Sequence, residues 1–219
     1  MRVMQGKQGG FTLVEIAIVL VIIGLLLGGI LKGQEMITQA KIKNVVADFS
    51  GVSAAYYGYQ DRYRAIPGDD PNAATRWTVA PAAVAGGGNG VIQGKYNSQT
   101  DADESRKWWD HLRRAGFVSG SGYSQPFNAL AGIIGVQTGD AGTPTIGPAM
   151  GGISGLMVCS TNLTDKVAIA LDTQMDDGAP EKGTVRADLQ GPPNPDLDNT
   201  VPSGYQETGT NIYVVCRAM

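Results

Sequence analysis

The strongest hydrophobic pattern in the chain is an apolar run near the N-terminus, over residues 11–31. Glu15 is the only ionisable residue of this run, and residues 16–30 contain no polar side chain. At about 1.5 Å per residue, a helix of this length spans roughly 31 Å, which matches the hydrocarbon core of a bilayer. The run therefore predicts a membrane-spanning helix.

Two basic residues, Arg2 and Lys7, precede the run. The positive-inside rule keeps this end in the cytoplasm and places the chain after Lys32 across the membrane. A secretory signal peptide also has a basic start, but its apolar core is about 7–15 residues long and ends in a small-residue cleavage site. Residues 29–35 contain no such site. The pattern thus favours a retained single-pass anchor.

The helix is expected to continue beyond the membrane, because the apolar positions become periodic. They recur mostly three or four residues apart, at Ile42, Val45, Val46, Phe49, Val52, Tyr56, Tyr59 and Tyr63. This spacing forms one apolar stripe on a helix with polar faces elsewhere. Pro67 cannot continue a helix and pushes Ile66 toward an extended conformation. We expect one helix from Phe11 to about Arg64, with its second half packed on a soluble head.

The rest of the chain predicts an α+β head. Residues 66–100 have few periodic apolar positions and many turn residues. A short helix follows, where Asp101 and Glu104 have the spacing of a capping box and Gly116 stands at the C-terminal cap. Apolar segments bounded by turn residues predict strands at residues 155–160, 166–171, 183–189 and 211–217. Such strands favour an antiparallel sheet on which the long helix lies.

Composition narrows the chemistry. The 219 residues include one histidine, His111, and two cysteines, so neither a four-cysteine nor a Cys2His2 zinc site can form. No nucleophile elbow, Walker loop or dinucleotide-binding glycine motif is present, so we expect no enzyme, no catalytic residue and no cofactor. A net charge of −3 and a pI near 5.1 argue against bulk attraction to nucleic acid.

Glu15 is the anomaly in the apolar run. A carboxylate costs about 2.5–3.5 kcal/mol at the centre of a membrane helix, less near its end, and is by default functional. A cut between Gly10 and Phe11 would create an α-amino group four residues before Glu15. That group could neutralise the carboxylate within the chain or in a neighbouring subunit.

The sequence GGFTLVE, residues 9–15, and the apolar run after it resemble the processing site of type IV pilins and type II secretion pseudopilins. The resemblance implies that a prepilin peptidase cuts after Gly10 and methylates Phe11. It also implies that Glu15 pairs with the N-terminal amine of a neighbour during filament assembly. The competing interpretation is a simple anchor with an accidental Glu15 near its cytoplasmic end.

The same resemblance implies a division of the chain. Residues 1–10 form a leader that is removed, residues 11–34 a membrane and assembly helix, residues 35–64 its amphipathic continuation, and residues 65–219 a periplasmic or extracellular head. The expected partners are prepilin peptidase, other pilin or pseudopilin subunits in a homo- or hetero-filament, and the inner membrane. The sequence leaves open whether the filament is a pilus or a secretion pseudopilus.

The two cysteines, Cys159 and Cys216, both fall in predicted strands of a compartment that permits disulfides. A bridge between them would contribute on the order of 4 kcal/mol in the chain-entropy model. Many pilins carry one disulfide in the C-terminal part of the head, so the resemblance implies the same bridge. Two reactive thiols, or two ligands joined by His111, are the alternative.

Two further features allow a functional or a structural interpretation. Arg106, Lys107, Arg113 and Arg114 flank the short helix, either as the anionic-partner or DNA site of a minor tip pilin or as a solvated face. Asp172, Asp176 and Asp177 lie within six residues and end at Gly178, either as oxygen ligands for calcium or as an ordinary turn. Some pseudopilins depend on calcium, although the spacing here is not that of an EF-hand.

Overall fold

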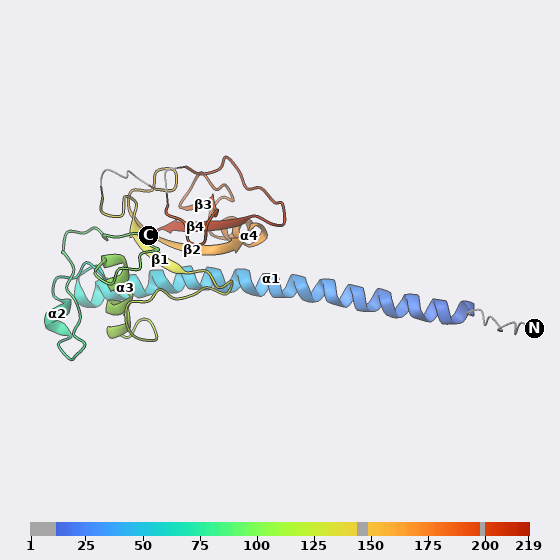
Figure 1. Ribbon diagram of the computed structural model, residues 1–219, viewed down its shortest axis with the longest axis horizontal. Helices are drawn as coiled ribbons and strands as arrows, with labels where there is room; N and C mark the ends of the chain where they lie inside the picture. Colours follow the sequence, from blue (N-terminus) through green and yellow to red (C-terminus); the bar gives the residue numbers. More distant parts are fainter. Residues whose placement is uncertain (1–11, 144–148, 198–199) are drawn as a thin grey trace, which may run out of the picture. The chain divides into compact units, whose positions relative to one another are not determined.

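The computed structural model describes residues 12–143, 149–197 and 200–219 (Figure 1). It contains four helices and four strands in these ranges: α1 (Leu13–Tyr63), α2 (Ala73–Arg76), α3 (Glu104–Arg114), β1 (Ile134–Thr138), β2 (Leu156–Thr164), α4 (Asp165–Met175), β3 (Val185–Leu189) and β4 (Ile212–Ala218). The chain divides into two compact units between Ala40 and Lys41, within α1.

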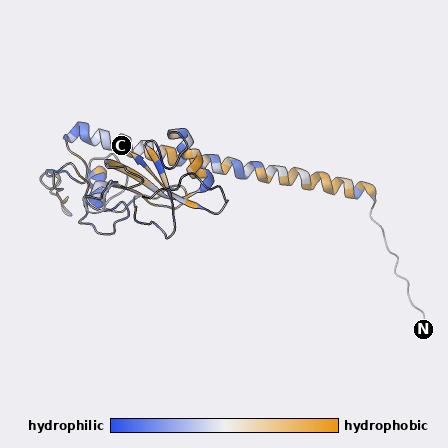
Figure 2. Ribbon diagram, turned by 90° about the horizontal axis from the view of Figure 1, so that it is seen from above, coloured by the Kyte–Doolittle hydropathy of each residue, from blue (hydrophilic) through white to orange (hydrophobic). Residues whose placement is uncertain are grey.

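The first unit, which ends at Ala40, contains the apolar part of α1. Within the described residues, α1 is the one helix long and apolar enough to cross a membrane, with a mean hydropathy of 2.8 in its most apolar window. Figure 2 shows this part of α1 in the hydrophobic colour. Its large apolar side chains are uncovered, and Leu25 for example is 73% exposed. An apolar surface of this size requires a membrane or other protein chains to cover it.

In the second unit, α1 from Lys41 onward buries a single stripe, as the sequence predicted. The stripe consists of Ile42, Val45, Phe49, Val52, Ala55 and Tyr59. These positions are three or four residues apart, so they lie on one face of the helix. The helix ends at Tyr63, where Arg64 takes a positive φ of 56° shortly before Pro67. The predicted end at Arg64 is therefore right to within one residue.

The strands form one antiparallel sheet with the order β1-β2-β4-β3. This confirms the expected α+β class. Side chains alternate between the two faces of the sheet, so on β4 Tyr213 and Val215 join the cluster that contains α1, α3 and α4. Val214 and Cys216 join a second cluster on the opposite face, which loops cover. Figure 1 shows α1 and α3 beside the sheet.

The strand predicted at residues 166–171 is wrong, because this segment belongs to helix α4. Its apolar residues fit the period of a strand as well as that of a helix, since Val167, Ile169 and Leu171 alternate along the chain. The structure instead buries Val167, Ala168 and Leu171, which share one helical face. A short apolar run cannot separate a strand from a buried helix by periodicity alone.

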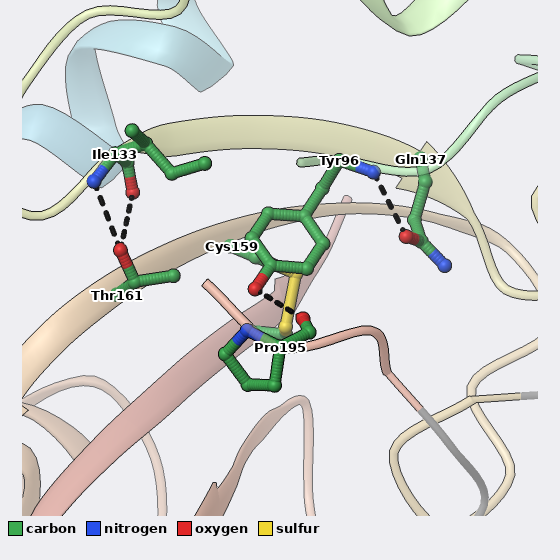
Figure 3. The surroundings of a disulfide bond; sticks show 7 residues. Tyr96, Ile133, Gln137, Cys159, Thr161 and Pro195 are labelled. Carbon is green, nitrogen blue, oxygen red and sulfur yellow. Dashed lines mark hydrogen bonds between the residues drawn. A yellow bond between two sulfur atoms is a disulfide. The ribbon is translucent and has the colours of Figure 1, made fainter. Parts of the chain in front are cut away.

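The sequence prediction also missed β1. This strand carries Gly135 and Gln137 in its interior, and neither residue favours a strand. The glycine is required by packing, because a Cβ at Gly135 would lie 2.2 Å from the carbonyl oxygen of Tyr96. The segment around Tyr96 therefore approaches β1 closely, and the Tyr96 amide donates to Oε1 of Gln137 at 3.0 Å (Figure 3).

The short helix α3 starts later than predicted, and its capping box is wrong. Asp103 is the N-cap and makes no side-chain cap hydrogen bond. Asp101 instead accepts from Arg106, and Glu104 accepts from the amides of Gly87 and Gln93. The C-terminal cap is confirmed, since Gly116 has a φ of 82° and its amide donates to a carbonyl of the last turn.

Candidate functional site

The N-terminal end of α1 is closed by reciprocal hydrogen bonds between Thr12 and Glu15. The backbone N–H and the hydroxyl of Thr12 each donate to Oε2 of Glu15 at 2.8 Å. In return, the backbone N–H of Glu15 donates to Oγ1 of Thr12 at 3.3 Å. Because α1 begins at Leu13, the two residues are the N-cap and the third helical residue of a capping box. The sequence motif T-x-x-E encodes it, although the sequence prediction did not include it.

This capping box reduces the cost of a carboxylate in an apolar helix. A negative side chain in the first turn faces the positive end of the helix dipole, which typically contributes 0.3–1 kcal/mol. The Thr12 donors satisfy one carboxylate oxygen of Glu15. Within the described ranges no residue donates to Oε1, so this oxygen can accept from a further partner. Gly10 and Phe11, the predicted cleavage-site residues, lie outside the described residues.

The apolar part of α1 contains four glycines whose missing side chains leave the helix backbone accessible. A Cβ added at Gly24, Gly28, Gly29 or Gly33 would meet no atom within 4 Å, apart from the local helix backbone. Small residues on a membrane helix let another helix approach closely. This part of α1 therefore offers contact surface to neighbouring helices.

The head is closed by a disulfide between Cys159 and Cys216, which confirms the predicted bridge. The two cysteines are register partners on the neighbouring strands β2 and β4, and both are fully buried. They lie on the sheet face that loops cover. Figure 3 shows the ring of Tyr96 beside the sulfur atoms, and its hydroxyl donates to the carbonyl of Pro195 at 2.6 Å.

A strap formed by residues 194–197 lies over this sheet face. Tyr96 holds it at Pro195, Asn97 donates to the carbonyl of Asn194 at 2.9 Å, and the hydroxyl of Thr161 donates to Oδ1 of Asn194 at 2.8 Å. Leu197 is buried in the cluster that contains the disulfide. The strap therefore keeps solvent away from the disulfide.

Asp172, Asp176 and Asp177 come together at the C-terminal end of α4, with one ligand atom of each within 4.8 Å of the others. We call them the α4 aspartate cluster. Burial raises the pKa of Asp172, although hydrogen bonds from Tyr205 and Gly178 partly offset the effect.

Each carboxylate of the α4 aspartate cluster also has a partner within the protein. Asp176 accepts from the amides of Thr184 and Val185, while Asp177 accepts from the amide of Ala179. A Cβ at Gly183 would meet a carboxylate oxygen of Asp176, and its φ of 70° also favours glycine. These bonds organise the loop between α4 and β3. Calcium binding by the cluster stays a prediction, because oxygen ligands are present but several lone pairs are already used.

The four basic residues of α3 hold neighbouring loops by hydrogen bonds. Arg106 donates to Asp101 and Gln125, and Lys107 donates to the carbonyl of Ala85. Arg114 pairs with Asp110 at 2.6 Å and donates to the carbonyl of Pro81. Arg113 donates to the carbonyls of Ser119 and Gly122. Neither a freely solvated face nor an open basic patch describes these side chains.

The single histidine is a structural residue of the head. His111 is fully buried, and its Nδ1 accepts from the amide of Gly68 at 2.9 Å. Its Nε2 lies 2.9 Å from the carbonyl of Val84, so a neutral ring satisfies both partners. Burial lowers the pKa of His111. The ring joins two loops and has no nucleophile beside it among these contacts.

A buried charge network that the sequence prediction missed fixes the end of α1 to the head. The carboxylate of Asp70 is fully buried and accepts from the Tyr59 hydroxyl at 2.7 Å and from Arg76 at 2.5 Å. Burial opposes ionisation of Asp70, but these hydrogen bonds outweigh it and lower the pKa. The Arg76 guanidinium also lies over the rings of Tyr63 and Trp77, at 4.2 and 5.1 Å.

Comparison with known families places a specific motif over the first part of the chain. Residues 5–31 match the family model described as the prokaryotic N-terminal methylation motif. No curated protein matches the chain. The chain thus carries the prepilin-type N-terminal motif of type IV pilins and pseudopilins, followed by an apolar helix and an α+β head.

Proposed function

We propose that this chain is a structural subunit, cut by a prepilin peptidase and assembled through α1 into a type IV pilus or a type II secretion pseudopilus. The observation that carries the proposal is the position of Glu15. It stands in the matched motif, at the capped end of a helix whose apolar side chains are exposed over residues 13–31.

Cleavage by the peptidase would supply a positive charge to pair with the carboxylate of Glu15. Hydrolysis of the bond between Gly10 and Phe11 releases an α-amino group, and methylation leaves that nitrogen basic. Oε1 of Glu15 accepts a hydrogen bond from the N-terminal ammonium group of a neighbouring subunit, while Thr12 donates to Oε2. Pairing removes the cost of an isolated carboxylate in the membrane, about 2.5–3.5 kcal/mol at the bilayer centre. Assembly is therefore favoured over the unpaired subunit.

In the proposed filament, the head is a folded domain held together by several tertiary contacts. Its disulfide, the strap and the Asp70 network tie its loops to α1 and the sheet. The inner membrane holds the subunit before assembly, with the head on the periplasmic side. The matched motif is the N-terminal methylation motif, which supports a structural subunit rather than an enzyme.

The test is incorporation of Glu15→Gln into filaments. The full chain is expressed with a prepilin peptidase and an assembly system, and sheared filaments and membranes are compared for the chain. We expect Glu15→Gln to be cleaved and inserted but at least tenfold depleted from filaments. Glu35→Gln is the matched control, because Glu35 lies on the same helix but pairs with Lys32 at an exposed position.

Normal incorporation of Glu15→Gln would contradict the assembly role. Loss of membrane insertion by the same variant would also contradict it, because Glu15 is proposed to act in assembly and not in insertion.

The alternative function, a tip subunit that binds DNA or another anionic partner through the basic residues of α3, has less support. All four side chains donate to the protein's own carboxylates or carbonyls. Nucleic-acid affinity depends on several phosphate contacts at once. Binding of a labelled oligonucleotide to the full chain at low salt would favour this alternative.

A further inference from the structure

A groove of about 510 Å³ lies at the C-terminal end of α3, and its lining includes no residue of the apolar part of α1 or of the cluster that contains the disulfide. Its volume is in the range of small-ligand sites. Its lining comes from three segments: the loop 79–81, the last turns of α3 with Asp110, Arg113 and Arg114, and the loop 120–123. None of these residues belongs to the processing motif.

Arg113 is the unusual cation of this groove. It donates to two carbonyls, those of Ser119 and Gly122, and has no carboxylate partner among the described residues. Arg114, by contrast, pairs with Asp110 at 2.6 Å. Burial lowers the pKa of Arg113, and the nearby Arg106 adds to that effect while Asp110 opposes it. The guanidinium is therefore partly desolvated without a paired anion.

The facing loop supplies further donors. Gly120 and Gly122 have φ angles of 95° and 75°, which only glycine adopts readily. Within the described part of the chain, the amides of Gly120, Ser121 and Gly122 donate to no acceptor. Ser121 is exposed and adds a hydroxyl. Backbone amides of this kind in a turn, beside a guanidinium, form a site for an anion.

The third wall of the groove is apolar. Val79 is 83% exposed, and Ala80 and Pro81 continue the same wall. Tyr123 lines the groove as well. The lining therefore offers a ligand a cation, the backbone of the loop 120–123 and uncovered hydrocarbon.

We propose that this groove binds an organic monoanion, a carboxylate that carries an apolar group, as at the C-terminal residue of a peptide. Two guanidinium groups and one carboxylate line the groove, which leaves a single positive charge to neutralise. One carboxylate matches this charge, whereas a phosphate dianion exceeds it. The planar fork of arginine fits a carboxylate by paired hydrogen bonds, and the apolar group lies against Val79.

Nucleic acid fits the site less well. Residues 41–219 contain four more acidic than basic side chains, so the field around the groove repels a polyanion. A single partly buried arginine also cannot reproduce the row of phosphate contacts on which such binding depends.

The test uses the full chain in detergent micelles with ¹⁵N-labelled arginine, observed by NMR at the Nε–H resonances. N-acetyl-leucine is the probe, N-acetyl-leucinamide is its uncharged counterpart, and inorganic phosphate is the competing anion. We expect N-acetyl-leucine to shift the Arg113 resonance in a saturable manner. The amide and phosphate should bind at least tenfold more weakly.

Three variants assign the site, with binding followed at the Arg114 resonance. Arg113→Gln and Val79→Glu are each expected to weaken N-acetyl-leucine at least tenfold, and Val79 is exposed enough that its replacement leaves folding intact. Lys166→Gln, an exposed cation on α4, should leave binding unchanged. Equal binding of the amide, stronger binding of phosphate, no saturable shift, or full affinity in Val79→Glu would each overturn the proposal.

Discussion

Replacement of Arg76 by Gln tests the buried network that joins the end of α1 to the head. The side chain of Asp70 is 0% exposed and that of Arg76 only 25% exposed, so water replaces the lost partner poorly. Removing one member of a buried ion pair typically costs 3–5 kcal/mol. Asp70 keeps the Tyr59 hydroxyl and the Asn72 amide as donors, so the lower end, about 3 kcal/mol, is the expected loss.

The assay is urea unfolding of the full chain in micelles, followed by tryptophan fluorescence. All three tryptophans, Trp77, Trp108 and Trp109, lie in the head, so the fluorescence reports its unfolding. Arg64→Gln is the matched control, because Arg64 is 83% exposed and its ion pair with Asp61 is long, at 3.7 Å. This control should change stability by less than about 0.5 kcal/mol.

The pH dependence gives a second readout of the same pair. The pKa of Asp70 is lowered in the folded head, so the pair contributes fully above the unfolded value of about 3.9. Its contribution is lost as the pH falls through the folded pKa. The gap between Arg76→Gln and the unaltered chain should therefore narrow below about pH 4. Equal losses of stability in Arg76→Gln and Arg64→Gln, or a difference that does not depend on pH, would show that the buried pair does not stabilise the head.

Three other features of the head give testable predictions. Cys159→Ser with Cys216→Ser should lower the free energy of unfolding by about 4 kcal/mol in the chain-entropy model, measured by urea unfolding. The lowered pKa of His111 means that its contribution is complete above about pH 6.5 and declines as the pH falls below it, a decline that should be absent in His111→Gln. Calcium should raise the Tm of the unaltered chain but not that of Asp176→Asn; no rise in the unaltered chain would end the calcium prediction. The raised pKa of Asp172 means that its contribution is greatest at low pH and declines as the pH rises through the folded value. When both are unfolded in urea without calcium, Asp172→Asn should therefore lose less stability than the unaltered chain as the pH rises above about 4.

The long helix and the processing motif could be predicted because their determinants are local. The apolar run over residues 11–31 and the stripe from Ile42 to Tyr59 repeat over many turns, so the period is unambiguous. The cap at Gly116 was equally visible, since a glycine at this position follows from local backbone geometry. The disulfide followed from having two cysteines in the predicted strands.

The missed features depend on tertiary contacts. Segment 166–171 fits both a strand and a helix, and only packing under the sheet selects α4. Glu104 does not form the predicted capping box, because its carboxylate accepts hydrogen bonds from the loop amides of Gly87 and Gln93. The pairing of Asp70 with Arg76 needs a fold that buries both, and no spacing in the sequence announces it.

Mass spectrometry of the N-terminus is the most direct test of processing by a prepilin peptidase. The protein is recovered from membranes of a cell that has a prepilin peptidase, and its intact mass and N-terminal peptide are measured. We expect a chain that begins at Phe11, is heavier by one methyl group, and has Cys159 and Cys216 oxidised. An uncleaved chain that begins at Met1 in those membranes would contradict the assignment and leave a simple membrane anchor with an unexplained Glu15.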